Sequence, residues 1–277
     1  MSVSAAYVTY EDPDGFDDEK EIALAAWAEA GIDGRIVRWD DPGVDWSAFD
    51  IVVVRSVWDY VARRAEFLDW ARRVESVTRL ANPAAVLERN TDKTYLRDLA
   101  VPIIPTSWVE PGQAVDLPDL DEYVVKPAIS AGARDTIRTT DRGKAEAHAA
   151  RLAAEGRTAM IQPYLDMVET EGETSLLYFG GRLSHTVRRN PMLAGGTAAP
   201  DADNARAQLR DPDPDQVALA ERVLAEFPGV LYARVDLVRL PDGGAAVIEV
   251  ELTEPYLFLR YAPDAAAGMA RAVAEAV

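Results

Sequence analysis

The sequence predicts an α/β protein in which a small N-terminal domain with a parallel sheet precedes a larger α+β part. Strand and helix patterns alternate over roughly the first 80 residues, which is typical of a parallel sheet with covered faces. Later strands follow one another in pairs, joined by Gly-rich turns at residues 180–181 and 241–244, which predicts antiparallel hairpins. Hydrophobic residues make up 48% of the 277-residue chain, enough to bury a core.

We assign residues 1–82 to the N-terminal domain. Its helices show apolar residues at helical spacing, and its strands are short apolar runs. The predicted elements are strands at residues 5–9, 34–37 and 51–54 and helices at residues 19–30 and 63–77. Ligands of such folds bind at the carboxyl ends of the strands, which points to residues 10–12 and 55–60.

The rest of the chain divides into a connector and two further units. Three prolines mark residues 83–118 as a connector and the start of a central domain, with short helices at residues 84–89 and 92–99. Residues 119–166 form the next unit, and residues 167–277 form the last. Their predicted elements are strands at 122–127, 135–140, 158–161, 173–179, 182–188, 231–238 and 246–252 and helices at 143–154, at 214–227 and from 263 onward. Residues 192–212, rich in Ala, Gly, Asp and Pro, are predicted to form a mobile loop.

Composition excludes several classes of function. The formal net charge of -18 argues against binding to the phosphate backbone of nucleic acid and to anionic membrane surfaces. The absence of cysteine excludes disulfides and thiolate chemistry, and two histidines are too few for a His-rich zinc site. We find no apolar run long enough to span a bilayer and no signal peptide, so we expect a cytoplasmic protein that acts on a small molecule. The sequence leaves open whether it is a monomer or a homodimer.

The last two predicted strands form a hairpin that gathers carboxylates on one face. Side chains alternate along a strand, so Glu249 and Glu251 share a face. The apolar residues of the same strand take the other face: Ile248, Val250 and Leu252.

The register of this hairpin opposes two of the carboxylates. If Leu240 pairs with Ala245 across the turn, Asp236 lies opposite Glu249, and Arg234 lies opposite Glu251. Opposed carboxylates repel, so the arrangement needs a reason. A hard divalent cation such as Mg²⁺ is a good reason, because it prefers oxygen ligands and shares them with phosphates. The alternative is that Asp236 faces water while Glu251 pairs with Arg234.

Two of the four lysines stand in unusual places. Lys126 interrupts an otherwise apolar strand, where a cation is costly unless it meets an anion; the alternative is an edge-strand lysine that reaches water. Lys93 follows a helix N-cap run, where a cation opposes the helix dipole; the alternative is an ordinary exposed lysine. The loop after Lys126, residues 130–133, lacks bulk, so its backbone amides could approach phosphate oxygens.

These features follow one another in a specific order: two lysines, a small-residue loop, a strand ending in Gln162-Pro163-Tyr164-Leu165, and a late Asp…Glu-x-Glu hairpin. In this order the chain resembles the ATP-grasp superfamily from Asn82 to its C-terminus, with a preceding α/β domain of the expected kind. The resemblance implies an ATP-grasp fold, ATP and Mg²⁺ as cofactors, and an ATP-dependent carboxylate–amine ligase that works through an acyl phosphate. The alternative of another class is a nucleotide-binding protein without turnover.

The resemblance also implies roles for individual residues. Lys93 and Lys126 resemble the two lysines that hold the ATP phosphates, and Arg188 resembles the arginine that steadies the transferring phosphate. The other positions similar to the superfamily's site are the phosphate-covering loop from Ser130, Ala131 and Gly132 to Arg134, the adenine-reading hinge from Gln162 through Tyr164 to Leu165, the ribose-binding acid Glu173, and the metal ligands Asp236, Glu249 and Glu251. The common pattern has Asn in place of Glu251, which either binds metal or pairs with Arg234.

Three sequence segments narrow the resemblance to a glutathione-synthetase-like branch of the superfamily. They lie at residues 54–60, 171–176 and 249–252. This branch includes the cyclo-ligase that closes O-ureido-D-serine to D-cycloserine, a step of antibiotic biosynthesis. The resemblance therefore implies such an intramolecular cyclisation or, as the alternative, a two-substrate ligase like glutathione synthetase.

Arg55 is our candidate for contact with the substrate carboxylate, because it places a cation at the end of a buried strand. The alternative is an ion pair with Asp59 or Asp12. Trp58 and Tyr60, which follow in the chain, either shape the pocket or only pack.

Overall fold

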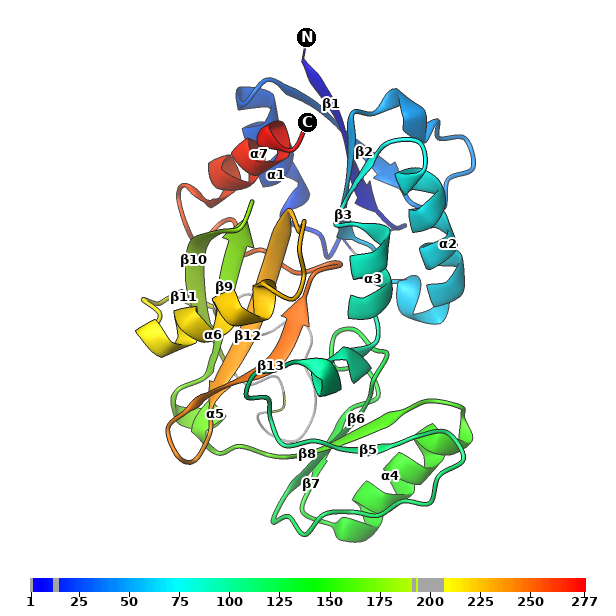
Figure 1. The fold of residues 1–277 in the computed structure, drawn as a ribbon, viewed down its shortest axis with the longest axis vertical. Coiled ribbons are helices and arrows are strands. Elements are labelled where there is room, and N and C mark those ends of the chain that lie inside the picture. Colours follow the sequence, from blue (N-terminus) through cyan, green and yellow to red (C-terminus); the bar gives the residue numbers. More distant parts are fainter. Residues whose placement is uncertain (1, 12–14, 191–192, 194–206) are drawn as a thin grey trace.

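The computed structural model of the chain describes residues 2–11, 15–190, 193 and 207–277. These residues form three sheets, which succeed one another along the long axis of the molecule (Figure 1). Helices cover the first sheet, and the other two are antiparallel, so the predicted α/β class with an α+β second part is confirmed. Within the described ranges, no helix is long and apolar enough to cross a membrane.

The N-terminal sheet is parallel, with the strand order β2-β1-β3-β4. Its strands are β1 (Val3–Thr9), β2 (Ile32–Arg38), β3 (Ile51–Ser56) and β4 (Arg79–Ala81), and its helices are α1 (Lys20–Glu29) and α2 (Arg64–Glu75). The central strands β1 and β3 are apolar runs because both of their faces are covered. The sequence did not predict β4, which has only three residues and therefore no readable periodicity.

The second sheet lies at the opposite end of the molecule from the N-terminal sheet (Figure 1). Its strands are β5 (Ser107–Val109), β6 (Tyr123–Pro127), β7 (Ile137–Thr139) and β8 (Ala159–Pro163), in the order β5-β8-β6-β7. Ala149 and Leu152 of α4 (Arg142–Ala154) pack with Val125 and Ile161 on one face. Because β6 lies between two neighbours, Lys126 does not lie on an edge strand, and that alternative is wrong.

The third and largest sheet has the order β11-β10-β9-β12-β13. Its strands are β9 (Glu173–Phe179), β10 (Arg182–Arg189), β11 (Gln208–Leu209), β12 (Tyr232–Arg239) and β13 (Ala245–Glu251), and the short helix α5 (Met167–Thr170) precedes them. Leu219 and Val223 of α6 (Pro214–Leu224) cover one face. The helix begins at Pro214 behind a capping box of Asp213 and Gln216. Of the predicted mobile loop, residues 192 and 194–206 lie outside the described residues.

A short connector joins the N-terminal sheet to the others. It contains α3 (Ala84–Asn90) and a 3₁₀ helix (Lys93–Asp98), where a short helix over residues 92–99 was predicted. Asp92 begins the 3₁₀ helix by accepting a hydrogen bond of 3.0 Å from the Thr94 backbone N–H. The Asn90 side chain donates to the Val250 carbonyl at 2.7 Å and accepts from the Leu252 N–H at 2.8 Å. The connector is therefore fixed to β13.

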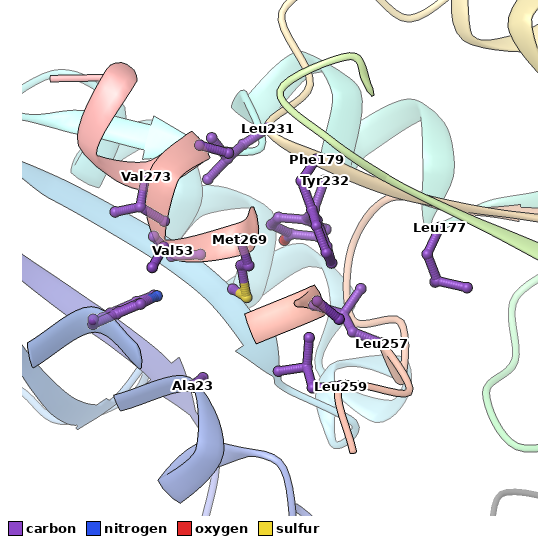
Figure 2. Close-up of a cluster of buried hydrophobic side chains, with 14 of the residues drawn as sticks. Ala23, Val53, Leu177, Phe179, Leu231, Tyr232, Leu257, Leu259, Met269 and Val273 are labelled. Carbon is purple, nitrogen blue, oxygen red and sulfur yellow. The ribbon is translucent and has the colours of Figure 1, made fainter. Parts of the chain in front are cut away.

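The last helix, α7 (Ala265–Glu275), returns to the N-terminal domain and lies beside α1 (Figure 1). Figure 2 shows the core that results: Met269 and Val273 of α7 meet Ala23 of α1, Val53 of β3 and Tyr232 of β12. Burial of one such large apolar side chain contributes roughly 1.5–3 kcal/mol. The shared core therefore holds the N-terminal sheet against the largest sheet and fixes the space between them.

Candidate active site

One cavity of about 700 Å³ is lined by residues of all three sheets or the segments beside them. Its walls come from the segments that follow β1 and β3, from β6, β8 and the loop at residues 130–136, and from the polar face of the largest sheet. The parallel strands thus contribute through their carboxyl ends, as such folds require. All the site residues that the sequence indicated line this cavity except Arg55 and Arg188.

The carboxylate hairpin has the predicted cross-strand pairs. Asp236 lies opposite Glu249, and Arg234 lies opposite Glu251. All four line the cavity, and Asp236 is only 2% exposed, so the alternative that it faces water is wrong.

The pairing next to the turn of this hairpin differs from the prediction. Arg239, not Leu240, pairs with Ala245, and a β-bulge between Asp236 and Leu237 restores the pairs beyond it. Ile248 is the extra residue of the bulge, so it lines the cavity instead of joining the opposite, buried face.

Two arginines neutralise Asp236. Arg189 donates to it at 2.9 Å and Arg234 at 3.0 Å, while the Ser175 hydroxyl donates at 2.6 Å. Burial alone would raise the pKa of Asp236, but the two arginines outweigh burial and lower that pKa below its usual range. Asp236 is therefore an anion at neutral pH.

Glu251 forms an ion pair with Arg234, so the pairing that the sequence left open is present. Glu251 also lines the cavity. Burial, opposed by Arg234, raises the pKa of Glu251 to about 7. A cation that binds in the cavity would therefore lower the pKa of Glu251 and favour its ionised form.

Both predicted lysines lie in the cavity wall. Lys93 is buried, not exposed as the alternative had it; its Nζ donates to the Ser130 carbonyl at 2.6 Å and lies 3.2 Å from Glu249. Lys126 forms no ion pair or hydrogen bond within the part of the chain that the structure describes. Burial, with Lys93 close by, lowers the pKa of Lys126. An anion entering the cavity would restore its ordinary charge.

The small-residue loop between β6 and β7 faces these lysines. Gly132, Ala133 and Asp135 have positive φ angles of 61°, 53° and 60°, a backbone form that exposes N–H groups to an anion. Arg151 of α4 and Arg157 form ion pairs with Asp135 and so fix the far end of the loop to the second sheet.

The hinge segment at residues 162–165 forms another part of the cavity wall. The Gln162 side chain donates to the Thr106 hydroxyl at 2.8 Å, and the guanidinium of Arg138 stacks 3.3 Å above the Tyr164 ring. Beside them, a satellite apolar cluster offers flat walls suited to an aromatic base: Ile104, Leu165, Val168, Val238 and the bulged Ile248.

Arg189, rather than Arg188, faces the cavity. Arg189 is 5% exposed and lies between Glu173, at 2.8 Å, and Asp236. Arg188 points to the other side of β10, where it donates to the backbone carbonyls of Thr170 and Glu171. The structure therefore places a different arginine from the predicted one beside the carboxylates.

Arg55 lies behind the cavity, not in its wall. It donates to the Pro255 carbonyl at 2.8 Å and lies 3.9 Å from Glu19, and it is only 3% exposed. The ion pair with Asp59 is also absent, because Asp59 accepts from Trp39 and pairs with Arg63. Asp12, the other expected partner, lies outside the described residues.

The residues around Arg55 position the chain that follows β13. Glu19 accepts hydrogen bonds from the Leu257 and Leu259 N–H groups, both at 2.7 Å. Trp58 and Tyr60 line the cavity, so they shape the pocket as well as pack.

The segment after β13 presents Glu254 and Tyr256 to the cavity. Sequence reasoning missed both residues, because no local sequence pattern marks them.

The acidic set fits a divalent cation that is shared with phosphates. Among the described residues, no three acidic or imidazole side chains form a complete metal cage. Mg²⁺ does not need one, because it commonly takes one or two carboxylates together with phosphate oxygens and water. The hard oxygens of Asp236, Glu249 and Glu251 meet that requirement, and each carboxylate also contacts a cation of the protein.

Comparison with known proteins finds relatives over almost the whole chain. Residues 5–82 match the family model described as D-cycloserine synthetase DcsG, N-terminal domain. The cycloserine biosynthesis protein DcsG of Streptomyces lavendulae is 39% identical over 277 residues, with 91% of each chain covered. The crystal structure of the D-cycloserine synthetase DcsG superposes with a TM-score of 0.90 at 37% identity, covering 98% of this chain and 99% of that one.

More distant structures share the fold. A RimK domain protein ATP-grasp from Sphaerobacter thermophilus superposes with a TM-score of 0.67 at 18% identity, covering 97% of this chain and 98% of that one. The D-alanine–D-alanine ligase of Bacillus anthracis, complexed with ATP, superposes with a TM-score of 0.66 at 15% identity, covering 99% and 97%. The predicted ATP-grasp fold is confirmed.

Proposed function

This chain belongs to the D-cycloserine synthetase DcsG family of ATP-grasp ligases, and we propose from this premise that it closes O-ureido-D-serine to D-cycloserine. The chain is an ATP-dependent carboxylate–amine ligase; the proposal specifies its substrate and the intramolecular course of the reaction. The observation that carries it is the single cavity in which free lysine charge, oxygen ligands and an apolar base pocket meet.

The cavity suggests how ATP would lie. Its base would enter the apolar cluster beside the hinge, and its ribose would reach Glu173. Lys126 and Lys93 would hold the phosphates, with the loop at residues 130–134 above them. The phosphate charge would compensate the half-buried ammonium of Lys126, which forms no ion pair or hydrogen bond in the described chain.

Asp236, Glu249 and Glu251 would hold Mg²⁺ together with the ATP phosphates. When bound, this ion supplies charge neutralisation at the transferring phosphoryl group. Arg189 already neutralises Asp236 at 2.9 Å and faces the same cavity, so we assign to it the role that the resemblance implied for Arg188.

The proposed reaction has two steps. The substrate carboxylate attacks the γ-phosphorus of ATP, which forms an acyl phosphate and releases ADP. The oxygen-bound nitrogen of the same molecule then attacks the acyl carbon, which forms the ring C–N bond and releases phosphate. The carbamoyl group, which the product lacks, leaves by hydrolysis as CO₂ and ammonia. Because nucleophile and acyl carbon belong to one molecule, proximity supplies much of the rate.

The chain's own cations and its enclosure assist both steps. Lys93, Lys126 and Arg189 offer fixed positive charge where negative charge develops, and such preorganised charge acts strongly in a water-poor site. The small-residue loop and the hinge would shield the acyl phosphate from water.

The substrate proposal predicts a specific pattern of ADP release. With Mg²⁺ and ATP, O-ureido-D-serine alone should support ADP release together with one equivalent of a cyclised product, as measured by a coupled assay and mass spectrometry. D-alanine, D-serine and glycine, singly and in pairs, serve as controls and should give at most slow release. Release only with a carboxylate–amine pair would contradict cyclisation and indicate a two-substrate ligase.

A further inference from the structure

Glu254 forms part of the cavity wall next to the carboxylate hairpin but has a different setting from the other acids. It lies three residues beyond Glu251, in the segment that leaves β13. Trp58 Nε1 donates to its backbone carbonyl at 3.2 Å, and Arg55 holds the next carbonyl, that of Pro255, at 2.8 Å. The backbone of Glu254 is thus fixed from the N-terminal domain.

The carboxylate of Glu254 forms no ion pair with any described residue, and the charge of Lys93, which pairs with Glu249, only partly offsets the charge of Glu254. The neighbouring acids do form ion pairs: Glu249 lies 3.2 Å from Lys93, and Glu251 pairs with Arg234. For Glu254 the described chain supplies one hydrogen bond, from the Tyr60 hydroxyl, and no ion pair. Burial, with Glu251 close by, raises the pKa of Glu254 to about 8. A half-buried carboxylate in this state gains more from a cation than from a neutral donor.

Aromatic rings surround this part of the cavity. Tyr10 and Trp58 meet edge to face with their centroids 6.1 Å apart, and Tyr60 and Tyr256 also line the wall. The Tyr256 hydroxyl is held by Asp18 at 2.8 Å. Aromatic faces attract cations, above all ammonium groups that lose water on binding. A carboxylate set among aromatic rings therefore favours an organic ammonium ion.

We propose that Glu254, within this aromatic wall, binds the α-ammonium group of the acid substrate, so that the enzyme selects an α-amino acid rather than a simple carboxylic acid. The inference rests on the proposed function for the place of the reacting carboxylate, beside Glu249 and the phosphates. An α-ammonium nitrogen is two bonds from that carboxylate carbon, so it must lie close by. Glu254 is the acid of this wall that forms no ion pair with any described residue and that Lys93 offsets only in part.

This contact also keeps the α-amino group from attacking the acyl phosphate of another molecule, since attack on its own acyl carbon would close a strained three-membered ring. An ammonium held as an ion pair keeps its proton and has no lone pair with which to attack the acyl phosphate. The oxygen-bound nitrogen of the ureido group, which is neutral, remains the nucleophile. Glu254 would therefore protect the α-amino group while its own charge is balanced.

The test compares two ligands on two proteins. O-Ureido-D-serine and 3-(ureidooxy)propanoate differ only by the ammonium group, and their binding can be measured by calorimetry with Mg²⁺ and ADP present, without turnover. Wild-type protein should bind the amino compound about 10–100-fold more tightly, as expected for a hydrogen bond between charged groups. Glu254→Gln should lose most of this preference and keep its affinity for ADP. The variant should fold, because it removes a half-buried charge that no ion pair balances.

Controls separate this inference from its rivals. Glu21→Gln, on the exposed side of α1, should behave as wild type. If Glu254→Gln keeps the wild-type preference, or raises the Mg²⁺ concentration needed for ADP binding instead, the ammonium assignment is wrong. Ammonium-dependent binding without ADP release in the ATP assay would contradict the proposed function but support this site. Turnover of both compounds with equal kcat/KM would support the proposed function but contradict the ammonium site. Failure of the wild-type protein to bind either compound would contradict the proposed function and the ammonium site together.

Discussion

Replacing Lys126 with alanine is expected to abolish turnover without destabilising the protein. The ammonium of Lys126 is unpaired in the described chain, and burial lowers its pKa, so its removal leaves no partner behind. Loss of a cation that meets the transferring phosphate should lower kcat/KM by about 10²–10³-fold or more. The free energy of unfolding should change little, because Lys126 is only half-buried and forms no ion pair or hydrogen bond in the described chain.

Two measurements check this expectation: ADP release with O-ureido-D-serine and urea-induced unfolding, both with Lys144→Ala as the matched control. Lys144 lies on the exposed side of α4, so its loss should alter neither quantity. A rate of ADP release by Lys126→Ala equal to that of the wild-type protein would contradict the assignment of Lys126 to the phosphate site. A large loss of stability would show instead that Lys126 has a structural partner.

Replacing Arg189 should harm both activity and stability, and replacing Arg188 should harm neither much. Arg189 bridges Glu173 at 2.8 Å and Asp236 at 2.9 Å within the buried face of the sheet. Arg189→Ala leaves two carboxylates with too little positive charge, which should cost about 3–5 kcal/mol of folding stability. ADP release should fall by about 10²–10³-fold, as for loss of a preorganised charge. Arg188 mainly donates to backbone carbonyls, so Arg188→Ala should cost about 1 kcal/mol.

Arg189→Lys keeps the prediction testable if the alanine variant does not fold. Lysine retains the charge but not the planar fork, so stability should recover more than kcat does. Steady-state kinetics and urea unfolding of Arg188→Ala and Arg189→Lys, side by side, decide between the two arginines. A greater loss of kcat in Arg188→Ala would restore the role that the sequence assigned to it.

The difference between these arginines has a definite physical origin. Phe179 pairs with Arg182 next to the turn, and a continuous register from there would place Arg188 opposite Glu173. A β-bulge between Leu183 and His185 shifts the register by one residue, so Arg189 occupies that position. A one-residue shift exchanges the two faces of a strand. Sequence patterns reveal alternation, but they do not reveal where a bulge interrupts it.

The same limit explains the hairpin of β12 and β13. The predicted turn pair, Leu240 with Ala245, is wrong, yet Asp236 and Glu249 are still opposed because a second bulge compensates. The identity of the carboxylates could be predicted, since Asp and Glu are unusual within an apolar strand. The position of Ile248 could not be predicted, because the bulge moves it to the cavity side.

Tertiary contacts explain why the positions of Arg55, Glu254 and Tyr256 could not be predicted from the sequence. The α/β class followed from periodicity, a local property. The place of Arg55 depends on Glu19 and Pro255, and Pro255 is 200 residues away in the chain. Glu254 and Tyr256 lie in an irregular segment whose position is fixed by Glu19, just before α1, and by Arg55 of β3. Such long-range contacts have no local sequence signal.

Transfer of oxygen from the substrate to phosphate is the most direct test of the proposed chemistry. In O-ureido-D-serine labelled with ¹⁸O in both carboxylate oxygens, the oxygen that attacks the γ-phosphorus leaves with the phosphate when the nitrogen closes the ring. Mass spectrometry should therefore find one ¹⁸O atom in each phosphate released, and one in each cyclised product. Unlabelled phosphate accompanying a fully formed product would contradict an acyl phosphate intermediate.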